Sequence, residues 1–532
     1  MENYKTTENL KLDKVATIDP DCNANDHKFN TLSDKEIFDN LFDHYVNNKF
    51  DNFEEDLLKV REYFCKEGGL PFYFMKTEKV FEKLLIIMLN IKTKIPNLFN
   101  LSLEIINQII AHSEETVNYL EVNDFTIFNQ INEVLEPFIN ENVINYNQFI
   151  PEMFNKPAYN NVTIDITINM VTNLCRSKPN ILFKNKVLYP LSNILRMKVN
   201  DNRIRDRQIV DCLGSILLKS SGKLLSKISY CNIVFQGYRS VFENFNDQQN
   251  CIIVISDICQ NLLRLLREES PMVILFYQNE FYQLILPVLD FIFANNVDLN
   301  YIVNILEFII ESISSDQKYC DGKDNYDFNS AINGIADMIG RENYVSNFYS
   351  YILNVTVERI HNSQYKPENL FSTDEGLIMS HLFDLLEQLI MIKDSTIIEY
   401  KNIEEVFLII DQNGKTELKI SMNNFIIGLI QNLPIDQLHR FLNLNFMPEL
   451  FESFIDFEEA NPIFIISAIE FILNKIGITN DHILAASSSK NNDAEINLIL
   501  QTFPEVLQSF LNSDTTNRVF ASSVLNTYFQ GL

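Results

Sequence analysis

Apolar residues return at helical spacing, three or four positions apart, along most of this 532-residue chain. From about residue 75 a unit recurs, in which an apolar helix, a short polar loop and a second apolar helix follow one another. The clearest copies are 80–113, 148–177, 186–220, 232–266 and 281–315, and looser copies follow at about 346–393, 397–433, 446–477 and 496–530. Such units cannot bury their own apolar faces, so the pattern predicts that they stack on one another as a solenoid.

The scarcity of glycine and proline also favours helices. The chain has 13 glycines and 15 prolines, whereas strand-rich folds use many such residues at their turns. Small polar residues near the ends of the second helices give the spacing of the units. They stand at Gln108, Asn173, Ser215, Asn261 and Ser312. The last three gaps, of 42, 46 and 51 residues, bracket the range of about 40–47 for armadillo and HEAT repeats, whereas the first gap, of 65 residues, is too long for one repeat and too short for two.

Four short segments carry a resemblance to a known family. LYPLSNIL (188–195) and LILPVLDFI (284–292) lie in middle helices, and VTNLC (171–175) and CQNLL (259–263) lie in last helices. They resemble the armadillo family, more closely over 80–315 than over 346–530. The resemblance implies an all-α fold, a right-handed α-solenoid (armadillo-like superhelix) whose concave face is lined by the last helix of each repeat.

The chain is expected to divide at its polar stretches. Residues 1–31 are polar and aperiodic and predict a disordered tail, followed by N-terminal helices over 32–74. Armadillo-like repeats are expected over 75–313 and over 331–532, separated by an exposed polar loop at 314–330.

Polar residues four positions apart predict a binding groove, because such positions share one helix face. They are Asn169, Asn173, Asp211, Ser215, Asp257 and Asn261. The resemblance implies that Asn173 and Asn261 hold the backbone of an extended peptide, whose unpaired N–H and C=O groups suit amide side chains. Importin-α-like receptors carry a tryptophan four residues before the asparagine, and this chain has none. The alternative is that these are ordinary solvated positions of amphipathic helices.

Positive charge is concentrated between Arg176 and Arg239, where 13 basic residues face only three acids in a chain of net charge −28. Arg203, Arg205 and Arg207 lie near the predicted start of a helix, where the macrodipole disfavours cations. Local helix stability therefore does not explain them, and we predict a patch that docks an acidic or phosphorylated feature. The alternatives are pairing within the chain, and simple balance of acidic neighbours such as 51–62.

No motif for catalysis or metal binding is evident in the sequence. The seven histidines form no HExxH, the eight cysteines form no CxxC, and GxSxG, GxxxxGK[ST] and GxGxxG are missing. We therefore expect no enzyme, no cofactor and no small-molecule substrate. The acidic net charge disfavours nucleic acid as a partner. The sequence contains no run of about 18 apolar residues, so we expect no membrane span. The cysteines are expected to be unpaired, which is typical of the cytoplasm, with the nucleus as an alternative.

The function expected from the sequence is that of a non-enzymatic protein-binding scaffold or adaptor, which holds a linear segment of a partner in the groove. An importin-like nuclear transport adaptor is the first alternative. Against it stand the missing tryptophans and the absence of a basic N-terminus of the kind that binds importin-β. A scaffold for cytoskeletal or signalling assembly is the second alternative.

Overall fold

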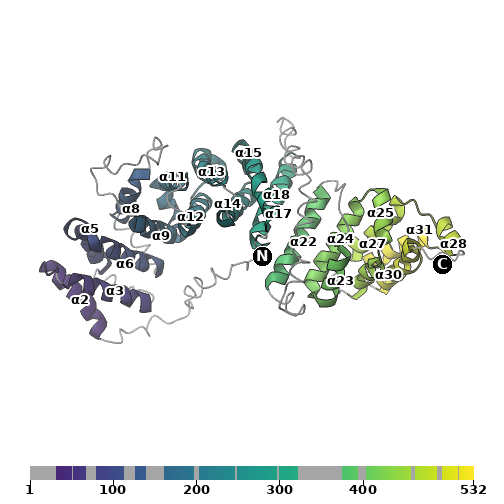
Figure 1. Cartoon of the computed structure of the whole chain (residues 1–532), viewed down its shortest axis with the longest axis horizontal. Coiled ribbons are helices and arrows are strands. Elements are labelled where there is room, and N and C mark those ends of the chain that lie inside the picture. Colours follow the sequence, from purple (N-terminus) through teal and green to yellow (C-terminus); the bar gives the residue numbers. More distant parts are fainter. Residues whose placement is uncertain are drawn as a thin grey trace. The chain divides into compact units, whose positions relative to one another are not determined.

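The computed structural model describes fourteen stretches of the chain, and all regular structure in them is helical (Figure 1). These stretches are 32–50, 52–67, 80–112, 126–138, 161–196, 203–245, 249–295, 297, 299–320, 374–392, 403–456, 462–487, 494–512 and 515–531. The prediction of an all-α chain is confirmed there. Contacts divide the chain into two compact units, Met1–Asn261 and Leu262–Leu532, which are taken in turn.

The first unit is built from helices of about two to five turns. They are α2 (Leu32–Val46), α3 (Phe53–Glu67), α5 (Val80–Lys94), α6 (Phe99–His112), α8 (Thr126–Leu135), α9 (Asn161–Ser177), α10 (Pro179–Lys184), α11 (Leu188–Arg196), α12 (Arg203–Lys219), α13 (Ile228–Glu243) and most of α14 (Gln249–Glu268). Short 3-10 turns occur at η1 (Pro96–Leu98), η2 (Glu136–Phe138) and η5 (Leu224–Lys227). Isoleucine, leucine and phenylalanine fill the space between the helices.

Helices α3, α6, α9 and α12 form a row in which each packs on the next. The hydrogen bonds Asp165–Arg205 and Thr172–Cys212 both join α9 to α12 across 40 residues of sequence. Because this separation is constant along the helices, the two helices run parallel. Two bonds extend the row to α14. In a second row α11 packs on α13, so this part of the unit has the two layers of a helical repeat protein.

A close approach of backbones joins the helices of the second row. Ser192 donates a hydrogen bond from its Oγ to the carbonyl oxygen of Ile233 at 2.6 Å. A Cβ added at Gly237 of α13 would lie 2.5 Å from Ser192 Oγ and 3.1 Å from its Cα. Only glycine at this position lets α13 come so close to α11.

The second unit is also built from helices that pack in a row. Its helices are α15 (Met272–Gln278), α16 (Phe281–Leu284), α17 (Leu286–Ala294), α18 (Leu299–Cys320), α22 (Asp374–Ile392), α23 (Ile403–Asn413), α24 (Thr416–Asn432), α25 (Ile435–Leu442), α26 (Met447–Asp456), α27 (Pro462–Lys475), α28 (Asn480–Ser487), α29 (Ala494–Asn497), the π-turn η7 (Leu498–Thr502), α30 (Phe503–Ser509), η8 (Phe510–Asn512) and α31 (Thr515–Tyr528). A row runs from α18 through α22, α24 and α27 to α31.

The spacing of helix starts is the same in both units. Helices α9, α12 and α14 begin at 161, 203 and 249, which are 42 and 46 residues apart. Helices α22, α24 and α27 begin at 374, 416 and 462, again 42 and 46 residues apart. This agreement supports a helical repeat protein.

A helix-ending turn also recurs in both units. Asn185 after α10 and Asn279 after α15 each donate from Nδ2 to the carbonyl oxygen four residues earlier, at 2.9 and 2.8 Å. The residue that follows each asparagine, Lys186 or Glu280, has a left-handed backbone with φ of 56° or 59°. Such a residue after the last turn ends a helix sharply, so the first helix of a repeat stops in the same way in each unit.

Two of the predicted boundaries differ from what the structure describes. Helix α18 continues to Cys320, so the first part of the predicted loop at 314–330 is helical. Ser315 packs within this helix and donates to Glu311 Oε1 at 3.4 Å, and no glycine interrupts the chain before Gly322. The rest of that loop, the predicted tail at 1–31 and the start of the predicted second half lie outside the described residues. The boundary between the two compact units falls between Asn261 and Leu262, inside α14.

Candidate functional site

The residues of the predicted groove lie on the neighbouring helices α9, α12 and α14, but the structure gives them different surroundings. Asp211 is exposed, and Asn169 and Ser215 are half-buried on the solvent side of α9 and α12. Asn173 donates from Nδ2 to Asn107 Oδ1 of α6 at 2.9 Å. The solvent side of α9 and α12 therefore presents Asn169, Asp211 and Ser215, while Asn173 ties its helix to α6.

Asn261 faces α12, which corrects its assignment to the groove. Its side chain is 2% exposed, and Nδ2 donates to the carbonyl oxygen of Val210 at 2.9 Å. A Cβ at Gly214 of α12 would lie 2.4 Å from Asn261 Oδ1, so the asparagine occupies the space that the glycine leaves. Gln260, one position earlier, is half-buried. The signal in the sequence was Gly214, an isolated glycine inside a helix, which often marks a close approach.

Arg205 and Arg207 of the predicted basic patch form ion pairs within the chain. Arg205 is 3% exposed, and its Nε lies 2.5 Å from Asp165 Oδ1 of α9. Arg207 Nε lies 2.6 Å from Asp257 Oδ2 of α14. The two arginines thus join α12 to the helix on each side of it. Their prediction as a docking patch is corrected, and the same ion pair accounts for Asp257. The side chain of Arg203 lies outside the described residues.

Four of the ten remaining basic residues of this window lie in the last turns of helices. Arg176, Lys184, Arg196 and Lys219 occupy the last turns of α9, α10, α11 and α12, where the helix macrodipole favours cations. Lys227 is buried, and its Nζ donates to the carbonyl oxygens of Leu217 and Ser220 at 3.0 and 2.8 Å. It therefore satisfies carbonyl groups that the end of α12 leaves open.

Polar side chains also join neighbouring helices of the second unit. Glu307 of α18 accepts a hydrogen bond from His381 Nε2 of α22 at 2.7 Å. Asp384 and Glu387 lie further along α22. Burial raises the pKa of both carboxyl groups, and the proximity of Asp384 raises the pKa of Glu387 further. Ser380 of α22 and Ser421 of α24 share a hydrogen bond of 2.8 Å.

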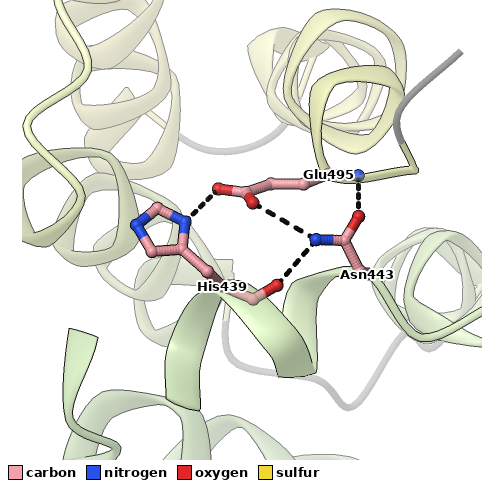
Figure 2. A network of polar contacts seen from close by, with 3 residues as sticks. All are labelled: His439, Asn443 and Glu495. Carbon is pink, nitrogen blue, oxygen red and sulfur yellow. Dashed lines mark hydrogen bonds and ion pairs between the residues drawn. The ribbon is translucent and has the colours of Figure 1, made fainter. Parts of the chain in front are cut away.

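A compact network joins α25 to α29 (Figure 2). His439 Nδ1 lies 2.8 Å from Glu495 Oε1. Asn443 donates from Nδ2 to the carbonyl oxygen of His439 at 2.8 Å and to Glu495 Oε2 at 3.4 Å, and its Oδ1 accepts from the backbone N–H of Glu495 at 3.1 Å. Asn443 therefore caps the start of α29, and the three residues hold that helix against α25.

Within the described residues, no three histidine, cysteine, aspartate or glutamate side chains come together as a metal site. No single helix in the same part of the chain is long and apolar enough to cross a membrane. Two bent pairs pass that test by length and composition, Met272–Gln278 with Phe281–Ile292 and Pro462–Lys475 with Asn480–Ser487.

Comparisons with known proteins add little to this picture. No protein-family model matches the chain, and no curated protein matches it. Among solved structures the chain is similar to a circular tandem repeat protein with novel repeat topology and enhanced subunit contact surfaces, at 12% identity and a TM-score of 0.23, over 92% of this chain and 93% of the other. A TM-score of this size carries no argument, so the helical repeat architecture rests on the helix spacing of this chain.

Proposed function

We propose that the chain is an armadillo-like, right-handed solenoid of the cytoplasm that serves as a non-enzymatic scaffold or adaptor. It binds a linear segment of a partner protein across the solvent side of α9 and α12. The observation that supports this most is the presence of polar side chains on two parallel neighbours: Asn169 is half-buried on α9, and Asp211 and Ser215 lie on α12. An extended segment offers unpaired N–H and C=O groups to such side chains, and Asp211 favours a cation on that segment.

A photo-crosslinking amino acid placed at Asn169 or Asp211 tests this proposal. In lysate, both positions should give the same covalent adduct, and mass spectrometry should locate it in one linear segment of one protein. Gln236, exposed on α13 of the other row, is the matched control position and should not give that adduct. The same adduct from all three positions, or none from Asn169 and Asp211, would contradict the proposal.

A synthetic peptide of the captured segment then measures affinity by fluorescence anisotropy. Asp211→Lys should weaken binding about tenfold or more, because a charge-assisted hydrogen bond contributes about 1.5–3 kcal/mol. The importin-like alternative would bind a lysine-rich signal peptide with the same dependence on Asp211. Asp257 is not a clean second probe, because it pairs with Arg207.

A further inference from the structure

Five exposed cations of the first unit gather around α10 and are not used in the ion pairs described above. They are Arg176, Lys184, Lys186, Lys219 and Lys223. None of them forms an ion pair with a described residue, in contrast to Arg205 and Arg207. Three of them lie in the last turns of helices, where the macrodipole explains why a cation is favoured. Their charged groups are nevertheless exposed to the solvent.

The packing of α10 brings these cations to one corner. Helix α10 packs on both α9 and α12. The backbone N–H of Ser221, between Lys219 and Lys223, donates to Asn180 Oδ1 of α10 at 2.6 Å. The ring of Phe183 at the end of α10 lies 4.5 Å from the ring of Tyr230. The ends of α9, α10 and α12 and the start of α13 therefore meet at this corner.

The segments that form the corner are free of acidic residues along the sequence. The segments 176–200 and 212–242 contain no aspartate or glutamate at all. Asp211, the nearest acid along α12, precedes Lys219 by eight residues, which is about 12 Å along the helix axis. This distance exceeds the Debye length of about 8 Å at physiological salt, so the corner presents a positive field despite the net charge of the chain.

Apolar and aromatic side chains stand among the cations. Leu225 and Ile228, which follow Lys223, are each 41% exposed. Phe183, Tyr189 and Tyr230 are half-buried, and the rings of Tyr189 and Tyr230 lie 6.3 Å apart. Aliphatic and aromatic side chains framed by lysine and arginine are typical of surfaces that rest on a membrane, where rings sit at the level of the headgroups.

We propose that this corner, formed by Arg176, Lys184, Lys186, Lys219 and Lys223 around Leu225 and Ile228, binds the surface of an anionic lipid bilayer. Each cation near an anionic leaflet strengthens binding about fivefold, and the aliphatic side chains add contact with the interface. The combination favours a bilayer over an acidic peptide, because the charges are spread over three elements and surround apolar side chains. The rest of the acidic chain is repelled, so the protein adopts one orientation on the membrane.

Co-sedimentation with vesicles tests the proposal with the full-length protein. The wild type should sediment with vesicles that contain about one-third phosphatidylserine, should not sediment with pure phosphatidylcholine, and should be released by high salt. The variant Lys184→Glu/Lys219→Glu/Lys223→Glu should bind at least about a hundredfold more weakly. The control variant Lys415→Glu/Arg440→Glu/Arg518→Glu changes the same charge at exposed residues of the second unit and should bind as the wild type does.

Further measurements separate a bilayer from other ligands. Leu225→Ser/Ile228→Ser should weaken binding to vesicles and leave its salt dependence in place. Thermal melting of each variant confirms that it is folded. Equal binding by the two triple variants, or no sedimentation of the wild type with phosphatidylserine vesicles, would overturn the proposal. Binding of a fluorescent polyglutamate peptide without binding of vesicles would overturn it too and would assign the corner to an acidic protein segment.

Discussion

At the scale of single residues, two arginines separated by one position join α12 to both of its neighbouring helices. Positions i and i+2 of an α-helix point in directions about 200° apart, so Arg205 and Arg207 leave α12 on opposite sides. Each finds an aspartate on the neighbouring helix, Asp165 on one side and Asp257 on the other. The pairs differ in burial, since the side chain of Arg205 is 3% exposed and that of Arg207 is 35% exposed. The pair of the buried Arg205 should therefore contribute more to stability than the pair of the partly exposed Arg207.

Removing the two aspartates should therefore have unequal effects. Asp165→Ala takes the ion-pair partner from a buried guanidinium, and we expect the free energy of unfolding to fall by about 2–3 kcal/mol. Asp257→Ala should lower it by less than about 1 kcal/mol, because water reaches Arg207. Urea denaturation of both variants gives the comparison. Equal losses would mean that burial of Arg205 does not decide the strength of its pair.

The sequence indicated that these arginines were unusual, and helical geometry alone could have shown that they do not form one patch. Arg205 must point away from Arg203 and Arg207 if the segment is a helix. What the sequence could not provide was the partner, because Asp165 and Asp257 are 40 and 50 residues away. The placement of Asn169, Asp211 and Ser215 away from the core follows from periodicity. The burial of Asn261 does not, because one position along a helix, from Gln260 to Asn261, turns the side chain by about 100°.

Gly214 provides a second test at this scale. Gly214→Ala would place a Cβ 2.4 Å from Oδ1 of Asn261, a side chain that is 2% exposed. We expect a net loss of about 1–2 kcal/mol, since overpacking outweighs the gain in helix propensity. Gly428→Ala of α24 is the matched control, because its added Cβ meets only the flexible side chain of Glu387 at 3.1 Å. It should be neutral or stabilising by up to about 1 kcal/mol, so its melting temperature should stay the same or rise while that of Gly214→Ala falls.

At the scale of elements, polar contacts between parallel neighbours set how the helices of each row pack. Apolar periodicity predicts the helices themselves, because it records which face is buried. It does not reveal helix ends such as those at Lys186 and Glu280. Both residues have a left-handed backbone, but lysine and glutamate do not indicate a turn in the sequence. Nor does periodicity show that Asp384 and Glu387 of α22 lie in the contact with α24, where burial raises the pKa of both carboxyl groups.

Glu387 predicts a dependence of stability on pH. Its pKa is raised in the folded state, by burial first and by Asp384 second. Stability from the protonated carboxyl group is fully present below its unfolded pKa and is lost as the pH rises through the folded pKa. At neutral pH the carboxylate therefore destabilises the fold. Glu387→Gln should melt at a higher temperature than the wild type at pH 7, and the difference should shrink as the pH falls toward 4.5, the ordinary value of the group.

Glu55 is the matched control for this experiment. It is an exposed carboxylate of α3 that pairs with Lys59 at 2.8 Å, and this partner lowers the pKa of Glu55. Glu55→Gln should therefore shift stability at pH 7 slightly downward, opposite in sign to Glu387→Gln. Parallel melting curves for Glu387→Gln and the wild type from pH 4.5 to 7 would show that the raised pKa has no consequence for folding.

At the scale of the whole molecule, the repeated spacing of helix starts predicts local responses to damage. In a stack of repeats each helix contacts mainly its neighbours, so stability is a sum of terms within repeats and between adjacent repeats. Hydrogen exchange with mass spectrometry on Gly214→Ala tests this directly. Amide protection should fall in α9, α12 and the part of α14 before Leu262, and it should stay unchanged in α24, α27 and α31, which belong to the other compact unit.

The reciprocal variant completes the argument. Ser421→Leu in α24 removes the hydroxyl bonded to Ser380 of α22 and overfills a buried position, so protection should fall in α22, α24 and α27 and persist in α9 and α12. Two separate patterns would mean that the chain unfolds locally, repeat by repeat, as expected when each repeat contacts mainly its neighbours. A uniform loss of protection in either variant would instead show one cooperative domain, and the equal spacing of 42 and 46 residues in the two units would then have no energetic counterpart.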